Sequence, residues 1–190
     1  VGTYGFTSRD IGPGNCLIDA WIRNNSEYKF DKNGLIASAG NRNDIILEQV
    51  EKLFSNRPNQ KTLSFDVNDF DVSFARGLSL EDGAATLTDF TARVIGAAFF
   101  ELLPNEGKKM TKVLVCGGGR KNKILIEKIK KNSLKNIVIQ QIDDYGINGD
   151  FVESQAFAFL AIRSILKLPI SFPNTTGCLI PCVGGEWINN

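Results

Sequence analysis

The chain has 190 residues, of which 43% are hydrophobic and 23% charged, with a formal net charge of +1. This composition is typical of one globular domain with a sizeable core. No apolar run approaches the roughly 18 residues of a membrane span, and the first residues carry no pattern of a secretory signal. Because there is no histidine, Ser–His–Asp and Cys–His catalysis are excluded, and acid–base chemistry must use carboxylates, lysines or water. The four scattered cysteines predict reduced thiols in a cytosolic protein rather than a zinc site.

The first candidate functional residue is Asp10, which lies ahead of the first predicted helix. Residues 1–9 alternate in character, as in a strand or a hairpin remnant, and a tight turn over 10–14 follows. Asn15 is the predicted N-cap of the helix. The apolar face of that helix comprises Leu17, Ile18, Trp21 and Ile22. A carboxylate at Asp10 would be ionised and held rigidly, although a turn aspartate that bonds its own backbone explains the pattern equally.

The middle of the chain alternates polar loops with two predicted helices. Residues 24–40 are polar and turn-rich, and a helix is predicted from Asp44 to about Ser55. The inward side chains of that helix are expected to be Ile46, Val50, Leu53 and Phe54. Residues 57–79 read as irregular, and their aspartates (Asp66, Asp69 and Asp71) alternate with apolar residues, as in an exposed strand or loop edge rather than a metal site. A long helix is then predicted over 81–103, with Ser79 and Asp82 at capping-box spacing.

The centre of the sequence is a strand, a glycine turn and a helix. Val113 to Cys116 reads as a buried strand, Gly117, Gly118 and Gly119 follow, and apolar residues then recur at helical spacing. Unpaired backbone N–H groups at such a turn favour an anion or a polar ring. The triplet is neither GxGxxG nor a P-loop, and a turn that merely packs a helix on a strand is the alternative. The next strand, 137–139, is expected to lie parallel and adjacent through a right-handed crossover.

Lysine and arginine are concentrated between residues 108 and 135, where Glu127 is the only acid. Such a stripe could attract nucleic acid or phosphate. We interpret it as the solvated face of a helix. No aromatic residues interleave with it to stack on bases, so nucleic acid is not an expected partner.

The last predicted helix runs from Asp150 to about Leu166, and its apolar residues nearly encircle it, which predicts burial on most sides. Glu153 follows Asp150 by three, an arrangement in which capping alone explains both carboxylates. The Pro/Gly-rich tail, 169–190, is expected to wrap the surface. The order of elements predicts an α/β fold.

Several segments, in order, resemble the anhydro-N-acetylmuramic acid kinase family. Residues 10–15 (DIGPGN) and 17–21 (LIDAW) resemble its DTGPGN…DAW segment. The family's GI.GD..EA.AFA.LA run matches residues 146–161. Further matches lie at 85–92, 115–122 and 176–177, and together they cover nearly the whole chain. The resemblance is to the family's C-terminal half only.

The resemblance implies a C-terminal-type domain of the actin/Hsp70/sugar-kinase (ribonuclease H-like) architecture, with a mixed sheet and packed helices. It implies a single domain over 1–190, with the base-bearing turn and helix in 1–25 at the domain junction, the nucleotide-pocket core in 80–190, and no N-terminal domain. The implied reaction is the ATP- and Mg²⁺-dependent opening and 6-phosphorylation of 1,6-anhydro-N-acetylmuramic acid to N-acetylmuramic acid 6-phosphate, in peptidoglycan recycling in the cytoplasm. We expect Mg²⁺ to be held mainly by the missing half and the nucleotide, and no metal ligand is assigned here.

The same resemblance assigns roles to particular residues. Asp10 is implied as the catalytic base, and Gly117, Gly118, Gly119 and Asn122 as nucleotide-binding. Substrate or second-layer roles fall on Gly12, Gly14, Asn15 and Glu153. ATP and the anhydromuramic sugar are the implied small-molecule partners, with a separate N-terminal half or a homodimer as the protein partner.

The chain departs from the family pattern at three places. Ile11 stands beside Asp10 where the family has Thr. The family's phosphate-cradling GTS.DG.D loop precedes the first residue, and its KSTGRE.F segment appears only as residues 61–66 (KTLSFD), without the Gly and Arg. We therefore expect no complete reaction by this chain alone. A non-catalytic, nucleotide-binding or dimerising remnant of the kinase is the alternative.

Overall fold

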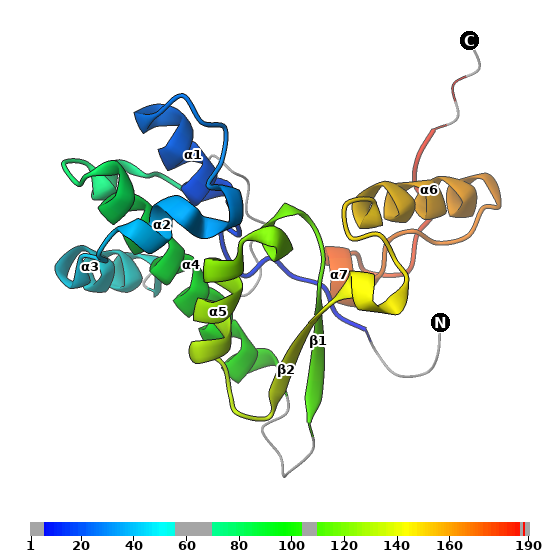
Figure 1. The fold of residues 1–190 in the computed structure, drawn as a ribbon. Helices are drawn as coiled ribbons and strands as arrows, with labels where there is room; N and C mark the ends of the chain where they lie inside the picture. The colour runs from blue at the N-terminus through cyan, green and yellow to red at the C-terminus, as the bar shows by residue number, and fades with distance from the viewer. Residues whose placement is uncertain (1–5, 56–69, 104–109, 187, 189–190) are drawn as a thin grey trace.

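The computed structural model describes residues 6–55, 70–103, 110–186 and 188 (Figure 1). The helices are α1 (Cys16–Asn25), α2 (Leu35–Ala39), α3 (Asp44–Ser55), α4 (Leu80–Leu102), α5 (Lys123–Lys131), α6 (Val152–Ile165) and α7 (Pro173–Thr176). The strands among these residues are β1 (Thr111–Val115) and β2 (Ile137–Gln141). The mixed α/β class is confirmed, and the predicted bounds of α3 and α4 hold to within about a residue. The short helix α2 falls in the stretch predicted to be only turn-rich.

Helix α4 is the centre of the core, and α1, α2, α3 and α5 pack around it (Figure 1). Ser79 caps its start by accepting a hydrogen bond from the Asp82 N–H at 3.1 Å, as predicted. The residues that follow its first turn, Gly83, Ala84 and Ala85, are small, and α1 lies very close to Gly83. A Cβ added at Gly83 would lie 2.2 Å from the Trp21 ring, and the Trp21 indole donates to the Leu80 carbonyl at 2.9 Å.

A buried carboxylate ties this core together. Asp89, on α4, is buried and forms salt bridges with Lys128 of α5 and with Arg42. The Arg42 Nη1 lies 3.5 Å from the Asp89 Oδ1. A buried charge is tolerated when it is paired and hydrogen-bonded. Lys128 is therefore a structural member of the basic stripe, while Lys123, Lys130 and Lys131 face solvent as predicted.

Within the described residues the sheet has two strands, β1 and β2, paired in parallel with Thr111 opposite Ile137 and Val115 opposite Gln141. The predicted adjacency and direction are confirmed. Side chains alternate across a strand. Val113 and Val115 consequently face the helical core, while Leu114 is exposed on the other face.

Helix α6 is set apart from the α1–α5 core, beside α7 and the tail (Figure 1). Every one of its residues is described and none is buried, so the prediction of burial on most sides is wrong for this chain. The Asp150–Glu153 capping prediction is also wrong. Phe151 occupies the N-cap without a side-chain hydrogen bond, and the Asp150 carboxylate is bound to basic side chains instead.

Other local predictions need correction. Residues 6–9 form no strand, and 1–5 lie outside the described residues. Asn15 is at the N-cap position of α1 but its side chain makes no capping bond. On α3, Leu47 is buried in place of Leu53, which is exposed. Asp66, Asp69 and the altered 61–66 segment lie outside the described residues.

Candidate functional site

The glycine turn begins where β1 ends, and its backbone is open to solvent. Gly117 has φ 74° and ψ 179°, a conformation that is essentially restricted to glycine. A 3-10 turn, Gly118–Lys121, leads directly to α5. A Cβ added at Gly117 or Gly118 would meet nothing within 4 Å. The turn therefore presents bare backbone to open space, as a nucleotide-contacting loop requires.

The side chain of Arg120 binds the backbone of this turn. Its side chain is only 4% exposed, and its Nε and Nη2 donate to the two carboxylate oxygens of Asp143 at 2.7 and 3.0 Å. Its Nη1 donates to Asp150 at 2.7 Å and to the carbonyl of Gly117 at 2.9 Å. Bidentate pairing of this kind fixes geometry as well as contributing energy. We call Arg120, Asp143 and Asp150 the arginine clasp.

The clasp joins the glycine turn to the loop that precedes α6. The Gly117 N–H donates to the Gly149 carbonyl at 2.9 Å, and the Gly149 N–H donates to Asp143 at 3.2 Å. Gly149 must be glycine, because a Cβ there would lie 2.4 Å from the Arg120 Nε. Two segments more than twenty residues apart are thereby locked together at the carboxyl ends of parallel strands, where ligands of open α/β sheets bind.

The electrostatics of the clasp keep both carboxylates ionised. The hydrogen bond from Arg120 lowers the pKa of Asp143 from 3.8 to about 2. Hydrogen bonds from Arg120 and then Lys121 lower the pKa of Asp150. The same bonds, from Asp143 first, raise the pKa of Arg120. These three groups are charged at neutral pH and satisfied by one another.

Asn15 brings the first candidate segment to the glycine turn. A Cβ added at Gly119 would lie 3.5 Å from the Asn15 Oδ1 and 3.7 Å from its Cγ. That Oδ1 is buried and has no hydrogen-bond partner within the described part of the chain. Residues 104 positions apart thus meet, and a polar atom at their junction is left to be satisfied by another group.

Asp10 is exposed, in the segment that leads to this junction. Its neighbour Arg9 forms a salt bridge to Glu101 of α4 at 2.8 Å, and the Ser8 N–H donates to the Asn174 carbonyl at 3.1 Å. On the other side, a Cβ at Gly12 would lie 2.5 Å from a Val94 methyl, so the turn packs closely on α4. The rigid placement predicted for Asp10 is consistent with these anchors.

The remaining predicted site residues lie in different settings. Asn122 is buried and caps α5, with its Oδ1 accepting from the Leu125 N–H at 3.0 Å. A nucleotide contact by its side chain stays a prediction, as does the role of Glu153, which is exposed on the first turn of α6. Gly14 is exposed with φ 54°.

Among the described residues, no group of three or more acidic, cysteine or histidine side chains is placed to hold a metal ion. Mg²⁺ therefore has no ligands assigned here.

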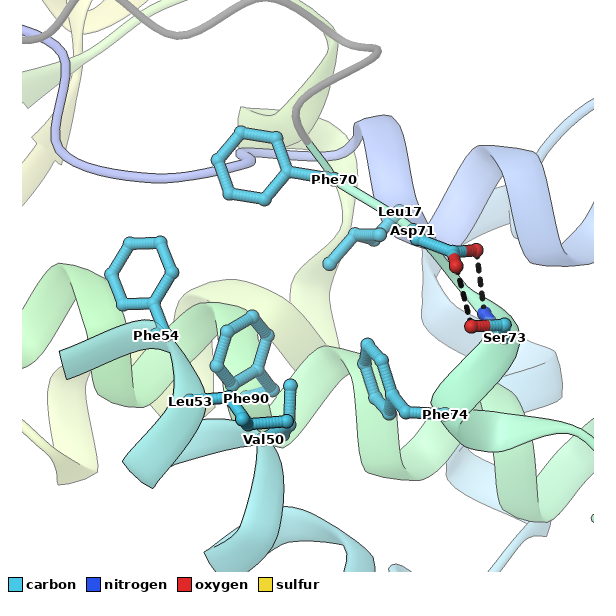
Figure 2. Close-up of a pocket in the computed structure, with 9 residues that line it drawn as sticks. All are labelled: Leu17, Val50, Leu53, Phe54, Phe70, Asp71, Ser73, Phe74 and Phe90. Atoms are coloured by element: carbon cyan, nitrogen blue, oxygen red, sulfur yellow. Dashed lines mark hydrogen bonds between the residues drawn. The ribbon is translucent and has the colours of Figure 1, made fainter. Parts of the chain in front are cut away.

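The chain also has an apolar pocket of about 230 Å³ on the helical side of the molecule (Figure 2). Its walls are the residues Leu17, Val50, Leu53, Phe54, Phe70, Asp71, Ser73, Phe74 and Phe90. The Asp71 carboxylate accepts hydrogen bonds from the Ser73 hydroxyl and N–H, which lower its pKa. With its one carboxylate used in this way, the pocket offers little to a phosphate or a sugar.

Comparison with known proteins identifies the family. The family model described as anhydro-N-acetylmuramic acid kinase matches residues 3–189. The chain belongs to the anhydro-N-acetylmuramic acid kinase family. It is 51% identical to the anhydro-N-acetylmuramic acid kinase of Pelagibacter ubique, over 96% of this chain and 49% of that protein. The corresponding kinases of Zymomonas mobilis and Caulobacter vibrioides are 40% and 36% identical, over 93% of this chain and 47% and 46% of those proteins.

The chain thus spans about half the length of these kinases, consistent with their C-terminal half. No helix in the described part of this kinase-family chain is long and apolar enough to cross a membrane. Sequence reasoning had assigned Arg120 to a solvated basic face and missed the clasp. One signal was available: Arg120 follows one strand and Asp143 the next, and parallel neighbours end at the same edge.

Proposed function

We propose that this chain is the nucleotide-binding, base-bearing half of an ATP-dependent kinase acting on 1,6-anhydro-N-acetylmuramic acid. The observation that carries the proposal is the open backbone of Gly117 and Gly118, held by the arginine clasp and joined to the Asp10 segment through Asn15. On this proposal residues 1–25 supply the base and 80–190 the nucleotide core of one domain. Membership of the kinase family supports ATP and the anhydro sugar as ligands.

The proposed chemistry gives two roles to residues of this chain. Asp10 accepts a proton from the water that attacks the anomeric carbon. As the bond from that carbon to O6 breaks, O6 attacks the γ-phosphorus and ADP leaves. The glycine turn lets the nucleotide approach the backbone and positions it. When bound, Mg²⁺ would neutralise phosphate charge.

The test is calorimetric titration of ATP with Mg²⁺ into wild type, Gly118→Val and Gln49→Val, each alone and mixed with the unmatched half of the Pelagibacter ubique kinase. Gln49 is exposed on α3, so its variant controls for an added exposed valine. We expect Gly118→Val to weaken ATP binding by about tenfold or more, because its side chain enters the open space over the turn. Gln49→Val should bind like wild type.

Equal affinities of wild type and Gly118→Val, or no ATP binding in either setting, would overturn the nucleotide site. A second assay separates the active kinase from a non-catalytic remnant. ADP release from the mixed halves, with the anhydro sugar present, is expected for wild type and lost in Asp10→Asn. Wild-type ATP binding without any sugar-dependent ADP release would establish the remnant.

A further inference from the structure

The apolar pocket on the helical side of the molecule has the size of a site for a small ligand (Figure 2). Its volume is about 230 Å³. Benzene binds in a dry apolar cavity of about 150 Å³, and sites for drug-sized ligands begin at about 300 Å³. The pocket therefore fits a ligand with a single ring. It lies among α1, α3, α4 and the 3-10 turn Ser73–Ala75, and none of the described residues that line it belongs to the glycine turn.

Four phenylalanine rings form much of the pocket wall. Phe54 stacks with Phe70, with ring centroids 6.1 Å apart, and meets Phe90 edge-on at 5.7 Å. Phe74 also meets Phe90 edge-on, at 6.0 Å. These rings hold one another in place around the hollow (Figure 2). Their faces and edges can pack against an aromatic ligand, and their faces also attract an ammonium group.

The polar edge of the pocket is negatively charged. Asp71 lies at this edge, is exposed, and accepts hydrogen bonds from the Ser73 N–H at 2.8 Å and from the Ser73 hydroxyl (Figure 2). Each carboxylate oxygen has two lone pairs, so further acceptor positions are left for a ligand. Arg76 acts on Asp71 electrostatically but is not part of the wall, and the described lining residues include no lysine or arginine. The edge therefore attracts a cation and repels an anion.

Both features are fixed by the core before a ligand arrives. Leu17 and Phe90, from α1 and α4, are 2% and 1% exposed, and the two bonds from Ser73 orient the Asp71 carboxylate. A preorganised site binds more tightly because less freedom is lost. We propose that this pocket binds a small primary ammonium compound with one aromatic ring. The ring packs among the phenylalanines, and the ammonium group donates to Asp71.

The test titrates 2-phenylethylammonium and phenylacetate, which are similar in size and opposite in charge, into the ¹⁵N-labelled chain at pH 7. Amide chemical shifts report the affinity and the place of binding. Val50→Phe puts a ring into the cavity, because Val50 is 8% exposed and lines it. Asp71→Asn removes the charge at the edge and keeps the size of the side chain. Glu48→Gln is the matched control, since Glu48 is exposed on α3 and is not among the lining residues.

We expect 2-phenylethylammonium to bind wild type and Glu48→Gln equally, about tenfold or more tightly than phenylacetate, and to shift amides of α3 and α4. Val50→Phe should weaken its binding by about tenfold or more, because the added ring occupies the space of the ligand. Asp71→Asn should weaken it by about fivefold, through loss of one charge pair.

Equal affinity of wild type for the two probes would overturn the proposal. So would the absence of binding at about 20 mM, which is above the dissociation constant expected for a ligand of this size. Wild-type affinity in Val50→Phe would place the probe elsewhere and overturn it as well. Circular dichroism checks that each variant is folded. If Val50→Phe does not fold, Asp71→Asn decides the matter, and unchanged affinity in that variant refutes the site.

Discussion

Two adjacent glycines of the turn are expected to respond to the same substitution with opposite signs. Gly117 has φ 74° and ψ 179°, whereas the φ of Gly118 lies outside the left-handed region. Neither Cβ would touch anything within 4 Å. Any difference between Gly117→Ala and Gly118→Ala is therefore a property of the backbone and not of packing.

The magnitude follows from the two conformations. An alanine at Gly117 costs about 1–3 kcal/mol in strain, and the reduced entropy of the unfolded chain returns about 0.4–1 kcal/mol. The turn is not free to relax, because the Gly117 N–H and carbonyl are both bonded, at 2.9 Å each, to Gly149 and Arg120. At Gly118 only the entropic gain applies. We expect Gly117→Ala to lose roughly 1–2 kcal/mol and Gly118→Ala to gain about 0.4–1 kcal/mol in free energy of unfolding.

The assay is urea denaturation of the ligand-free chain, followed by far-ultraviolet circular dichroism. With an m-value of about 2 kcal/mol/M, Gly117→Ala should lower the midpoint by about 0.5–1 M and Gly118→Ala should raise it slightly. Midpoints shifted in the same direction by similar amounts would refute the assigned backbone conformation of Gly117. An unchanged midpoint for Gly117→Ala would refute it as well.

Two further predictions concern the surroundings of the turn. The pKa of Asp143 is lowered from 3.8 to about 2, so its stabilising contribution is present above pH 3.8 and lost as the pH falls towards 2. In urea titrations Asp143→Asn should therefore be less stable than wild type at pH 6 and nearly equal to it at pH 2, and a pH-independent difference would contradict the clasp. Cys116 is exposed immediately before the turn, and Cys182 is exposed in the tail. ATP should slow the maleimide labelling of Cys116 by several-fold, on the order expected for a thiol beside a bound ligand. The labelling rate of Cys182 should not change. Equal labelling rates for Cys116 with and without ATP would place the nucleotide elsewhere.

Local signals in the sequence were sufficient for much of the fold. The Ser79 cap and the apolar periodicity predicted α3 and α4 to within about a residue, and the strand–glycine–helix order predicted that β1 and α5 exist. These features depend on neighbours within a few residues, through hydrogen bonds to the first turn and the 3.6-residue period. The predicted strand, Val113 to Cys116, is shifted from the observed Thr111–Val115, and it is half exposed where burial was predicted. Parallel pairing of β1 and β2 also followed, because a helix between two neighbouring strands returns the chain to the end of the sheet where the first strand began.

The candidate site could be predicted only in part, because its geometry depends on which distant segments lie next to one another. The glycine turn and Asp10 were recognisable as residue patterns, but their relation depends on the proximity of Asn15 to Gly119, which no local pattern specifies. Arg120 looked like one more basic surface residue. Its burial against Asp143 and Asp150 is decided by which strand ends lie side by side.

What the amino-acid sequence by itself determined is the set of elements, their faces and the chemical groups at the glycine turn. What only the tertiary structure decided is which of those faces and groups find partners. Helix α6 illustrates the difference: its composition requires an apolar neighbour, yet none of its residues is buried in the described chain. Hydrophobicity measures the free energy gained when a surface is covered. The packing of other segments determines whether anything lies close enough to cover it.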